Sequence, residues 1–220
     1  MTCSQCQGLD TLFDKRTAAK ELKNYRKKGP SKTTRWLIDA LKAEGIVGAT
    51  LLDIGGGIGA IQHELLKAGA SGAINVDAAS AYIEAAQEEA HREGLADRVR
   101  YHHGDFVQLA AAAGEADIVT LDRTICCYHD MAALVGHSTS LTRNLYGLVY
   151  PRDTWWVKFG LVMINFVSWL QREPYRFFAH PNQAVDALIR RQGLVPRFYR
   201  KTLLWQVAIY GRDNKREKQP

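Results

Sequence analysis

Short apolar runs alternate with amphipathic stretches along most of the chain, at the spacing expected of strands and helices. The runs that predict buried strands are, in chain order, Thr50–Ile54, Ala73–Asp77, Val99–His103, Asp117–Asp122 and Leu145–Tyr150. The stretches that predict helices between them are Ala60–Ala68, Ala79–Glu93, Phe106–Ala113 and Asp130–Arg143. Strands that alternate with helices in this way predict an α/β fold with a parallel, doubly wound sheet.

Two helices are expected before the first strand. Asp10–Lys27 and Ser31–Glu44 have apolar residues at helical spacing, and Gly29-Pro30 separates them. We therefore expect residues 1–44 to form an N-terminal helical cap. Tyr25, just before the break, could cover a ligand or simply pack in the core.

The C-terminal part of the chain predicts further elements of both kinds. The expected helices are Thr154–Leu170 and Pro181–Gln192, and the expected strands are Leu194–Tyr199 and Leu203–Tyr210. This pattern predicts a main domain over residues 45–212, with an apolar helical insertion at 154–172. Residues 213–220 are expected to form a basic tail.

The stretch 49–59, Ala-Thr-Leu-Leu-Asp-Ile-Gly-Gly-Gly-Ile-Gly, joins the first strand to the next helix. A glycine turn at this point lets a ligand lie against bare backbone at the positive end of a helix. Asp53 lies inside the strand, where a carboxylate is costly unless a positive or hydrogen-bonding group meets it. This turn is the first candidate for a ligand site.

Three more acids fall where predicted strands end, namely Asp77, Asp105 and Asp122. In a doubly wound sheet, ligands bind beyond the carboxyl ends of the strands. We therefore expect these carboxylates to share one site with the glycine turn.

Two classes of cofactor suit this pattern. Gly55 to Ala60 satisfies the dinucleotide fingerprint G-x-G-x-x-A, and Asp77 follows where an acid would bind a ribose. A dinucleotide would place a charged pyrophosphate close to Asp53, which would repel it. S-adenosylmethionine has an ammonium and a sulfonium group instead, and a carboxylate favours both. Asp53 therefore favours S-adenosylmethionine.

Asp53-Ile-Gly-Gly-Gly-Ile-Gly59 resembles the first motif of class I, Rossmann-like S-adenosylmethionine-dependent methyltransferases. The resemblance implies a seven-stranded sheet that is mostly parallel and closes with a C-terminal antiparallel hairpin. The cofactor-binding residues that it implies, together with the possible cover Tyr25, are Asp53, Gly55, Gly57, Asp77, Ala78, Asp105, Phe106 and Asp122.

Each of these residues also has a purely structural interpretation. The glycines could serve only the turn, and Asp77 or Asp105 could cap the helix that follows it. Asp122 could simply pair with Arg123 or Arg143. These alternatives stay open at the level of the sequence.

The segment after the fourth strand is expected to line the side of the site that holds the methyl acceptor. His129 is the candidate general base by residue type. Arg123 could bind an acidic acceptor through a bidentate contact, and Asp122 faces the transferred methyl group in the resemblance. The Asn-Pro-Pro-Tyr signature of many amino-group methyltransferases that act on nucleic acid or protein is absent.

The segment Thr154–Leu170 is apolar on nearly every side, and only Lys158 interrupts it with a charge. It is too short to be expected to span a membrane. It could be a core helix, a wall of a large apolar substrate pocket, or a contact with a membrane surface or a second subunit. With Tyr175–Pro181, it faintly resembles the C-terminal half of magnesium-protoporphyrin O-methyltransferases, which favours carboxyl or hydroxyl O-methylation.

Composition bounds the remaining possibilities. The 220 residues carry a net charge of +6 and four cysteines, and 46% of them are hydrophobic. The start of the chain lacks the apolar core of a signal peptide, so we expect a cytoplasmic protein. Cys3 and Cys6 could form half a metal site with Cys126 and Cys127, but this would be unusual and no metal is expected. The basic ends suit solvated surfaces better than nucleic acid.

The sequence therefore predicts a cytoplasmic S-adenosylmethionine-dependent methyltransferase that acts on a small, aromatic or apolar acceptor. It could form a homodimer and could touch a membrane surface. Two alternatives are a nicotinamide-dependent oxidoreductase and a methyltransferase-like module that binds without turnover. The sequence does not identify the acceptor atom.

Overall fold

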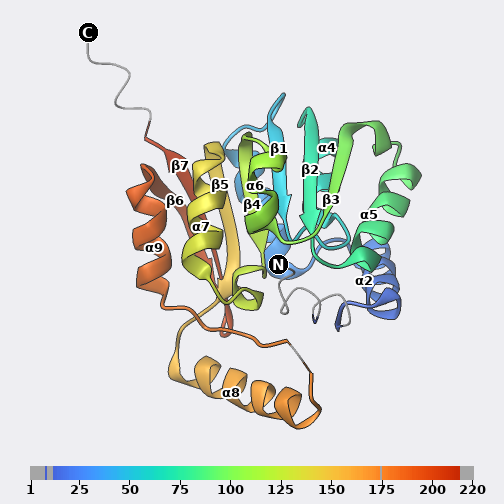
Figure 1. Ribbon diagram of the computed structural model, residues 1–220. Coiled ribbons are helices and arrows are strands. Elements are labelled where there is room, and N and C mark those ends of the chain that lie inside the picture. The colour runs from blue at the N-terminus through green and yellow to red at the C-terminus, as the bar shows by residue number, and fades with distance from the viewer. Residues whose placement is uncertain (1–7, 9–11, 174, 214–220) are drawn as a thin grey trace.

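The computed structural model describes residues 8, 12–173 and 175–213, and a seven-stranded sheet forms its centre (Figure 1). The strand order is β3-β2-β1-β4-β5-β7-β6. The strands are β1 (Thr50–Ile54), β2 (Gly72–Asp77), β3 (Val99–His103), β4 (Ala116–Asp122), β5 (Thr142–Pro151), β6 (Leu194–Lys201) and β7 (Trp205–Arg212). Strands β1 to β5 pair in parallel, whereas β7 is antiparallel to both β5 and β6. The predicted doubly wound sheet with its closing antiparallel pair is confirmed.

Helices cover both faces of the sheet. They are α2 (Lys15–Lys28), α3 (Lys32–Ala43), α4 (Ala60–Lys67), α5 (Ser80–Arg92), α6 (Phe106–Ala113), α7 (Met131–Ser140), α8 (Trp155–Leu170) and α9 (Asn182–Arg191), with short 3-10 turns η1 (Ala96–Arg98) and η2 (Ile125–Cys127). Helices α6, α7 and α9 pack on one face through residues such as Phe106, Leu134 and Ile189. Helices α3, α4 and α5 pack on the other through residues such as Leu37 and Leu65. The apolar strands are thereby buried on both sides, as a parallel sheet requires.

The N-terminal helices are packed against the main domain. Leu22 and Tyr25 of α2 are buried against residues of α5, and Arg26 Nε donates to Glu89 of α5 at 2.7 Å. Helix α3 packs on the sheet at β5 and β7. Gly29, with a φ of +73°, ends α2 and turns the chain into α3. The turn between these helices is thereby held at the edge of the sheet where the glycine turn lies.

The predicted helix Asp130–Arg143 is too long at its C-terminal end. Helix α7 ends at Ser140, and β5 already begins at Thr142, which pairs with Ala116 of β4. The hydroxyl of Ser138 donates to a carbonyl one turn earlier, and that of Thr142 donates to Ser138 O, so side chains bond the helix end. The helical spacing of residues in the sequence does not reveal this change from helix to strand.

Helix α8 is not a core helix, so that interpretation of Thr154–Leu170 is wrong. Figure 1 shows α8 set apart from the body, beyond the edge of the sheet where the parallel strands end. Only Val157 and Ser168 of its residues are buried, whereas Trp155 is 74% exposed. The sequence pattern shows that the helix is apolar but not which surface covers it. In the described part of the chain, no helix is long and apolar enough to cross a membrane.

Candidate active site

The glycine turn forms the floor of a cavity of about 690 Å³ at the carboxyl ends of the parallel strands. Gly55 has a φ of +64° and lies so close to Thr124 that a Cβ would collide with it. Gly57 has a φ of +55°, and a Cβ there would meet no atom within 4 Å. Both positions use the left-handed backbone that glycine adopts without strain. Gly57 thus leaves bare backbone next to open space, as a ligand cradle requires.

All residues predicted to bind the cofactor line this one cavity. They are Tyr25, Asp53, Gly55, Gly57, Asp77, Ala78, Asp105, Phe106 and Asp122. Arg123 lines it as well, from the end of β4. The structure therefore brings these side chains together from α2 and from four different strand ends, as the fold leads one to expect.

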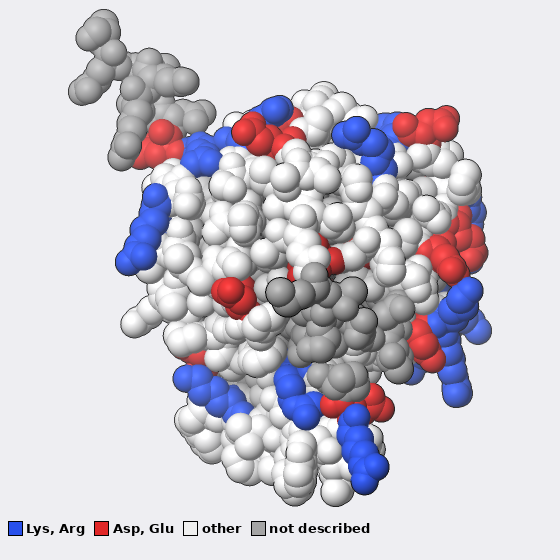
Figure 2. Space-filling model, in the orientation of Figure 1, with Lys and Arg blue, Asp and Glu red and all other residues white. Residues whose placement is uncertain are grey.

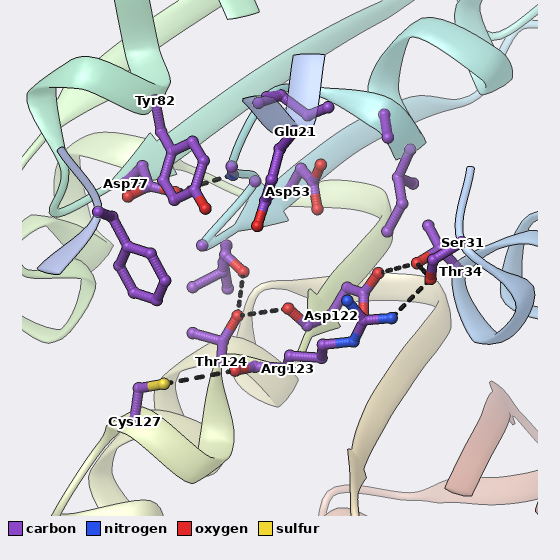
Figure 3. A pocket seen from close by; sticks show the side chains of 18 of the residues that line it. Glu21, Ser31, Thr34, Asp53, Asp77, Tyr82, Asp122, Arg123, Thr124 and Cys127 are labelled. Atoms are coloured by element: carbon purple, nitrogen blue, oxygen red, sulfur yellow. Dashed lines mark hydrogen bonds and ion pairs between the residues drawn. The ribbon is translucent and has the colours of Figure 1, made fainter. Parts of the chain in front are cut away.

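Asp53 is 1% exposed and carries an oxygen without a partner (Figure 3). Its Oδ1 accepts a hydrogen bond of 2.7 Å from the hydroxyl of Thr120, while no described group bonds to its Oδ2. Burial, opposed by the hydrogen bond from Thr120 and helped by the nearby carboxylates Asp122 and Asp77, raises the pKa of Asp53 to about 7. Such a side chain has room for one cationic or hydrogen-bond-donating ligand group.

Asp77 connects the end of β2 to the glycine turn. Its Oδ2 accepts from the amide of Gly57 and its Oδ1 from the amide of Ala79, each at 2.8 Å. Burial raises the pKa of Asp77, and these hydrogen bonds oppose that rise. Asp77 thus orders the turn before α5, but the N-cap position of that helix is Ala79, so Asp77 is not the N-cap. Because a carboxylate can accept about four hydrogen bonds, this role leaves capacity for a ribose.

Asp105 also has a structural role. It is the N-cap of α6 and accepts from Val107 N at 3.0 Å, so the capping alternative is observed. Its Oδ1 accepts a further bond of 2.9 Å from the hydroxyl of Tyr128. Phe106 beside it is buried. These residues form a corner of the cavity with one flat apolar side chain and one carboxylate, which suits a planar ring with polar edges.

Asp122 is bound to the N-terminal cap. Its Oδ2 accepts a bond of 2.5 Å from Thr34 Oγ1 on α3, and its Oδ1 is buried without a hydrogen bond. Arg123 Nε lies 3.7 Å from that Oδ1, so the predicted pairing with Arg123 exists as a loose ion pair. Arg143 pairs with Glu115 instead. Burial raises the pKa of Asp122, whereas Arg123 lowers it.

Arg123 has a φ of +60°, which is unusual for a residue with a side chain. Its guanidinium donates to Ser31 Oγ at 2.5 Å (Figure 3). It also donates to Thr33 Oγ1 at 3.1 Å and lies over the ring of Trp205. Ser31 is the N-cap residue of α3, but its side chain makes no cap hydrogen bond. Arg123 therefore ties the turn between α2 and α3 to the site.

His129 is exposed and is not among the residues that line the cavity, although Tyr128 and Cys127 are. Its ring stacks on that of Tyr128 at 5.4 Å. It lies two residues beyond the end of η2. The structure does not bring His129 to the cavity with Asp122 and Arg123.

Residues of the N-terminal cap complete the cavity, and sequence reasoning named only Tyr25 among them. Tyr25 donates to Glu64 of α4 at 2.9 Å. Glu21, one helical turn before Tyr25, faces Tyr82 of α5 across the cavity (Figure 3). Burial, and next the charge of Glu21, raise the pKa of Tyr82. The four-residue spacing of Glu21 and Tyr25 places them on one helix face, and this spacing could have indicated that Glu21 lines the cavity as well.

Basic side chains from the turn between α2 and α3 line the cavity too. They are Lys28, Lys32 and Arg35. The sequence suggested a solvated basic face for this stretch, because nothing local shows that the turn reaches the carboxyl ends of the strands. Arg35 braces the turn by donating to the carbonyl of Lys28 at 3.0 Å.

No group of three or more potential metal ligands occurs within residues 8, 12–173 and 175–213. Cys126 is buried and Cys127 is partly buried, and neither forms a disulfide. Cys3 and Cys6, which could have completed a metal site, lie outside the described residues.

Comparison with known proteins agrees with this geometry. Residues 51–144 match the model of a methyltransferase domain. A search of curated protein sequences gave no significant match. Among solved structures, magnesium protoporphyrin IX methyltransferase from Synechocystis PCC 6803, with bound S-adenosylhomocysteine, has a TM-score of 0.67 at 19% identity and covers 83% of each chain.

Two further solved structures show the same fold. An O-methyltransferase family protein from Burkholderia thailandensis has a TM-score of 0.67 at 16% identity, covering 92% of this chain and 61% of that one. Geranyl diphosphate C-methyltransferase from Streptomyces coelicolor A3(2) has a TM-score of 0.64 at 13% identity, covering 81% and 77%. At these identities the likeness is one of fold.

Residues 51–144 thus carry a methyltransferase domain, and the sheet has the Rossmann-like fold of S-adenosylmethionine-dependent methyltransferases. The cofactor that this domain implies is S-adenosylmethionine. The unpartnered Oδ2 of Asp53 fits a cationic group of a ligand. The open space beside Gly57 lets another part of the same ligand lie against the backbone. They fit S-adenosylmethionine better than a pyrophosphate, which the buried acids would repel.

Proposed function

We propose that the protein transfers a methyl group from S-adenosylmethionine to an oxygen of a small, aromatic or apolar acceptor that carries an acidic group. A carboxyl or hydroxyl oxygen is favoured over nitrogen. The observation that carries this proposal is the separation of charge in the cavity. The cavity of about 690 Å³ suits a small molecule as the partner.

Most acids of the cavity come from other elements than its bases, although Asp122 pairs with Arg123 where the two groups meet. Its carboxylates come mostly from the strand ends and are Glu21, Asp53, Asp77, Asp105 and Asp122. Its cations come from the turn between α2 and α3 and from the end of β4, and they are Lys28, Lys32, Arg35 and Arg123. The acidic residues suit the cationic cofactor, and the basic residues then suit an anionic acceptor.

The proposed roles follow from this arrangement. When bound, S-adenosylmethionine supplies an electrophilic methyl group on a sulfonium. Asp53 would hold the cofactor's ammonium group, Asp77 its ribose, and the corner at Phe106 its adenine. Lys28, Lys32 and Arg35 would orient the acceptor anion, and Tyr25 would cover the cofactor and help exclude water. Positioning and water exclusion can supply most of the acceleration of such a displacement.

A carboxylate acceptor is already deprotonated near neutral pH, so its methylation needs no general base. The proposal is therefore compatible with the exposed position of His129. Two similar folds belong to enzymes whose names refer to a porphyrin and to a prenyl diphosphate, and a third was solved with apigenin. The porphyrin, the prenyl chain and apigenin are aromatic or apolar groups, which supports an acceptor of this class here.

The proposal is tested by screening aromatic carboxylic acids, phenols and matched amines for methyl transfer. A double replacement, Lys28→Gln with Lys32→Gln, should raise the KM for a carboxylate acceptor about fivefold and leave the KM for S-adenosylmethionine unchanged. Lys27→Gln is the matched control, because Lys27 is exposed on the same helix and does not line the cavity. The proposal of an acidic acceptor would be refuted by transfer to amines alone. It would also be refuted if the double replacement left the KM for the acceptor unchanged.

A further inference from the structure

Helix α8 turns its apolar side outward. The side chains on this outer face are between 47% and 74% exposed, and they are Trp155, Phe159, Val162, Met163, Phe166, Trp169 and Leu170. The helical spacing of these positions places them on one continuous side. Leu203 and Leu204, in the turn between β6 and β7, are 69% and 50% exposed. Arg152 just before α8 donates to Leu203 O, so this turn lies beside the start of the helix.

The opposite side of α8 holds the helix to the protein. Val157 and Ser168 are its buried residues. Asn165 on the same side donates to Phe177 O at 2.7 Å and accepts from Phe177 N at 2.8 Å. The more polar side of the helix therefore faces the protein, and the aromatic side faces away from it. This is the reverse of the arrangement expected for a helix on a water-exposed surface.

Basic side chains border the exposed apolar face. Arg152 precedes α8, Lys158 lies in its first half, and Arg172 and Arg176 follow its end. The acids in the same segments are Asp153 and Glu173. Figure 2 shows an uncharged rounded surface at the bottom of the molecule, where α8 lies in Figure 1, with Lys and Arg side chains gathered along its upper border. A positive border around an apolar face complements an anionic lipid surface.

We propose that α8 docks the protein on an anionic lipid bilayer, with the helix lying in the plane of the interface. Its 16 residues are about 24 Å long, too short to cross the hydrocarbon core. Tryptophans stand at both ends of the helix, and their amphipathic rings favour the level of the lipid headgroups. The basic border of this face favours an anionic lipid surface over a second copy of the chain, which carries the same positive charge.

Docking in this way would bring the active-site cavity to the membrane. The chain after α8 packs on η2, where Phe178 N donates to Cys126 O at 2.7 Å and His180 Nε2 lies 2.9 Å from Tyr128 O. Tyr128 lines the cavity. An apolar acceptor dissolved in the bilayer could then enter directly. Only this last step rests on the proposed function, since docking itself requires only α8.

The test is co-sedimentation of the full-length protein with phosphatidylcholine vesicles, with and without about 30% phosphatidylglycerol. The protein should bind the anionic vesicles more strongly, bind them less at high salt, and show a blue shift of tryptophan emission, since three of its five tryptophans lie on α8. Phe159→Glu should lower the vesicle partition coefficient about tenfold. Val47→Glu is the matched control, because Val47 is 86% exposed before β1, at the opposite edge of the sheet.

Absence of binding to both kinds of vesicle would overturn the proposal. The proposal would also be overturned if light scattering showed a dimer that Phe159→Glu dissociates and the wild-type protein did not bind vesicles. A second copy of the chain would then cover α8. Binding of S-adenosylhomocysteine should be equal in the wild type and both variants. That readout reports the cofactor site, so failure of docking is distinguished from failure of the proposed enzymatic function.

Discussion

Thr120 of β4 donates a hydrogen bond of 2.7 Å to Asp53 of the neighbouring strand β1, and it leaves the second carboxylate oxygen of Asp53 unpartnered at the wall of the cavity. A buried carboxylate with one free oxygen is costly to the folded protein. It is useful only if a ligand supplies the missing partner. Asp53 therefore lowers the stability of the ligand-free protein and strengthens the binding of a ligand that supplies this partner.

Replacement of Asp53 by asparagine should change both the stability of the ligand-free protein and the binding of the cofactor. Because burial raises the pKa of Asp53 from 3.8 to about 7, its ionisation disfavours the folded state, so its contribution to stability falls as pH rises across that range. Asp53→Asn removes the ionisable group and with it this loss of stability at higher pH. The ligand-free variant should therefore gain thermal stability relative to the wild type as pH rises from 4 to 8, measured by thermal unfolding.

The same replacement should weaken cofactor binding. In the wild type, the dissociation constant of S-adenosylhomocysteine should fall as pH rises through about 7, because the ionised carboxylate is the form that holds an ammonium group. Asp53→Asn should abolish this dependence. Asp39→Asn, an exposed change on α3, is the control and should alter neither property. A variant that binds as well as the wild type at pH 8 would contradict the assigned contact.

Asp77→Ala should reduce the affinity for S-adenosylhomocysteine by about 1–3 kcal/mol, through the loss of charge-assisted ribose hydrogen bonds. The variant also removes the acceptor for Gly57 N and Ala79 N, which orders the turn. Asp77→Asn separates the two effects, since its single amide oxygen can still accept one of these bonds. Calorimetry on both variants is the measurement, and an unchanged dissociation constant in both would reject the ribose contact.

Most of the fold could be predicted from the sequence, because strands and helices of this class have distinct periodicities. Thr50–Ile54 and Val99–His103 were predicted with the observed ends, since each strand is bounded by a sharp change of pattern. The C-terminal end of α7 was not, because hydrogen bonding of Ser138 and Thr142 and strand pairing decide it. The residues at the strand ends shared one cavity as expected from topology alone.

What the sequence could not show depends on contacts between distant segments. Lys28 and Lys32 line the cavity only because Gly29 turns α2 into α3 at the edge of the sheet. His129 is next to cavity residues in sequence, but its side chain is exposed and does not line the cavity. The exposure of α8 was equally hidden, because an apolar pattern does not say whether protein or lipid covers it.

The most direct test of the account is calorimetric titration of the purified protein with S-adenosylhomocysteine, with NADH and NADPH as controls. We expect micromolar binding of S-adenosylhomocysteine with one site per chain and no heat of binding from either nicotinamide nucleotide. This result would support the role assigned to Asp53 and direct work to acidic aromatic acceptors. Binding of NADH or NADPH in place of S-adenosylhomocysteine would contradict the role of Asp53 and the methyl-transfer function that rests on it.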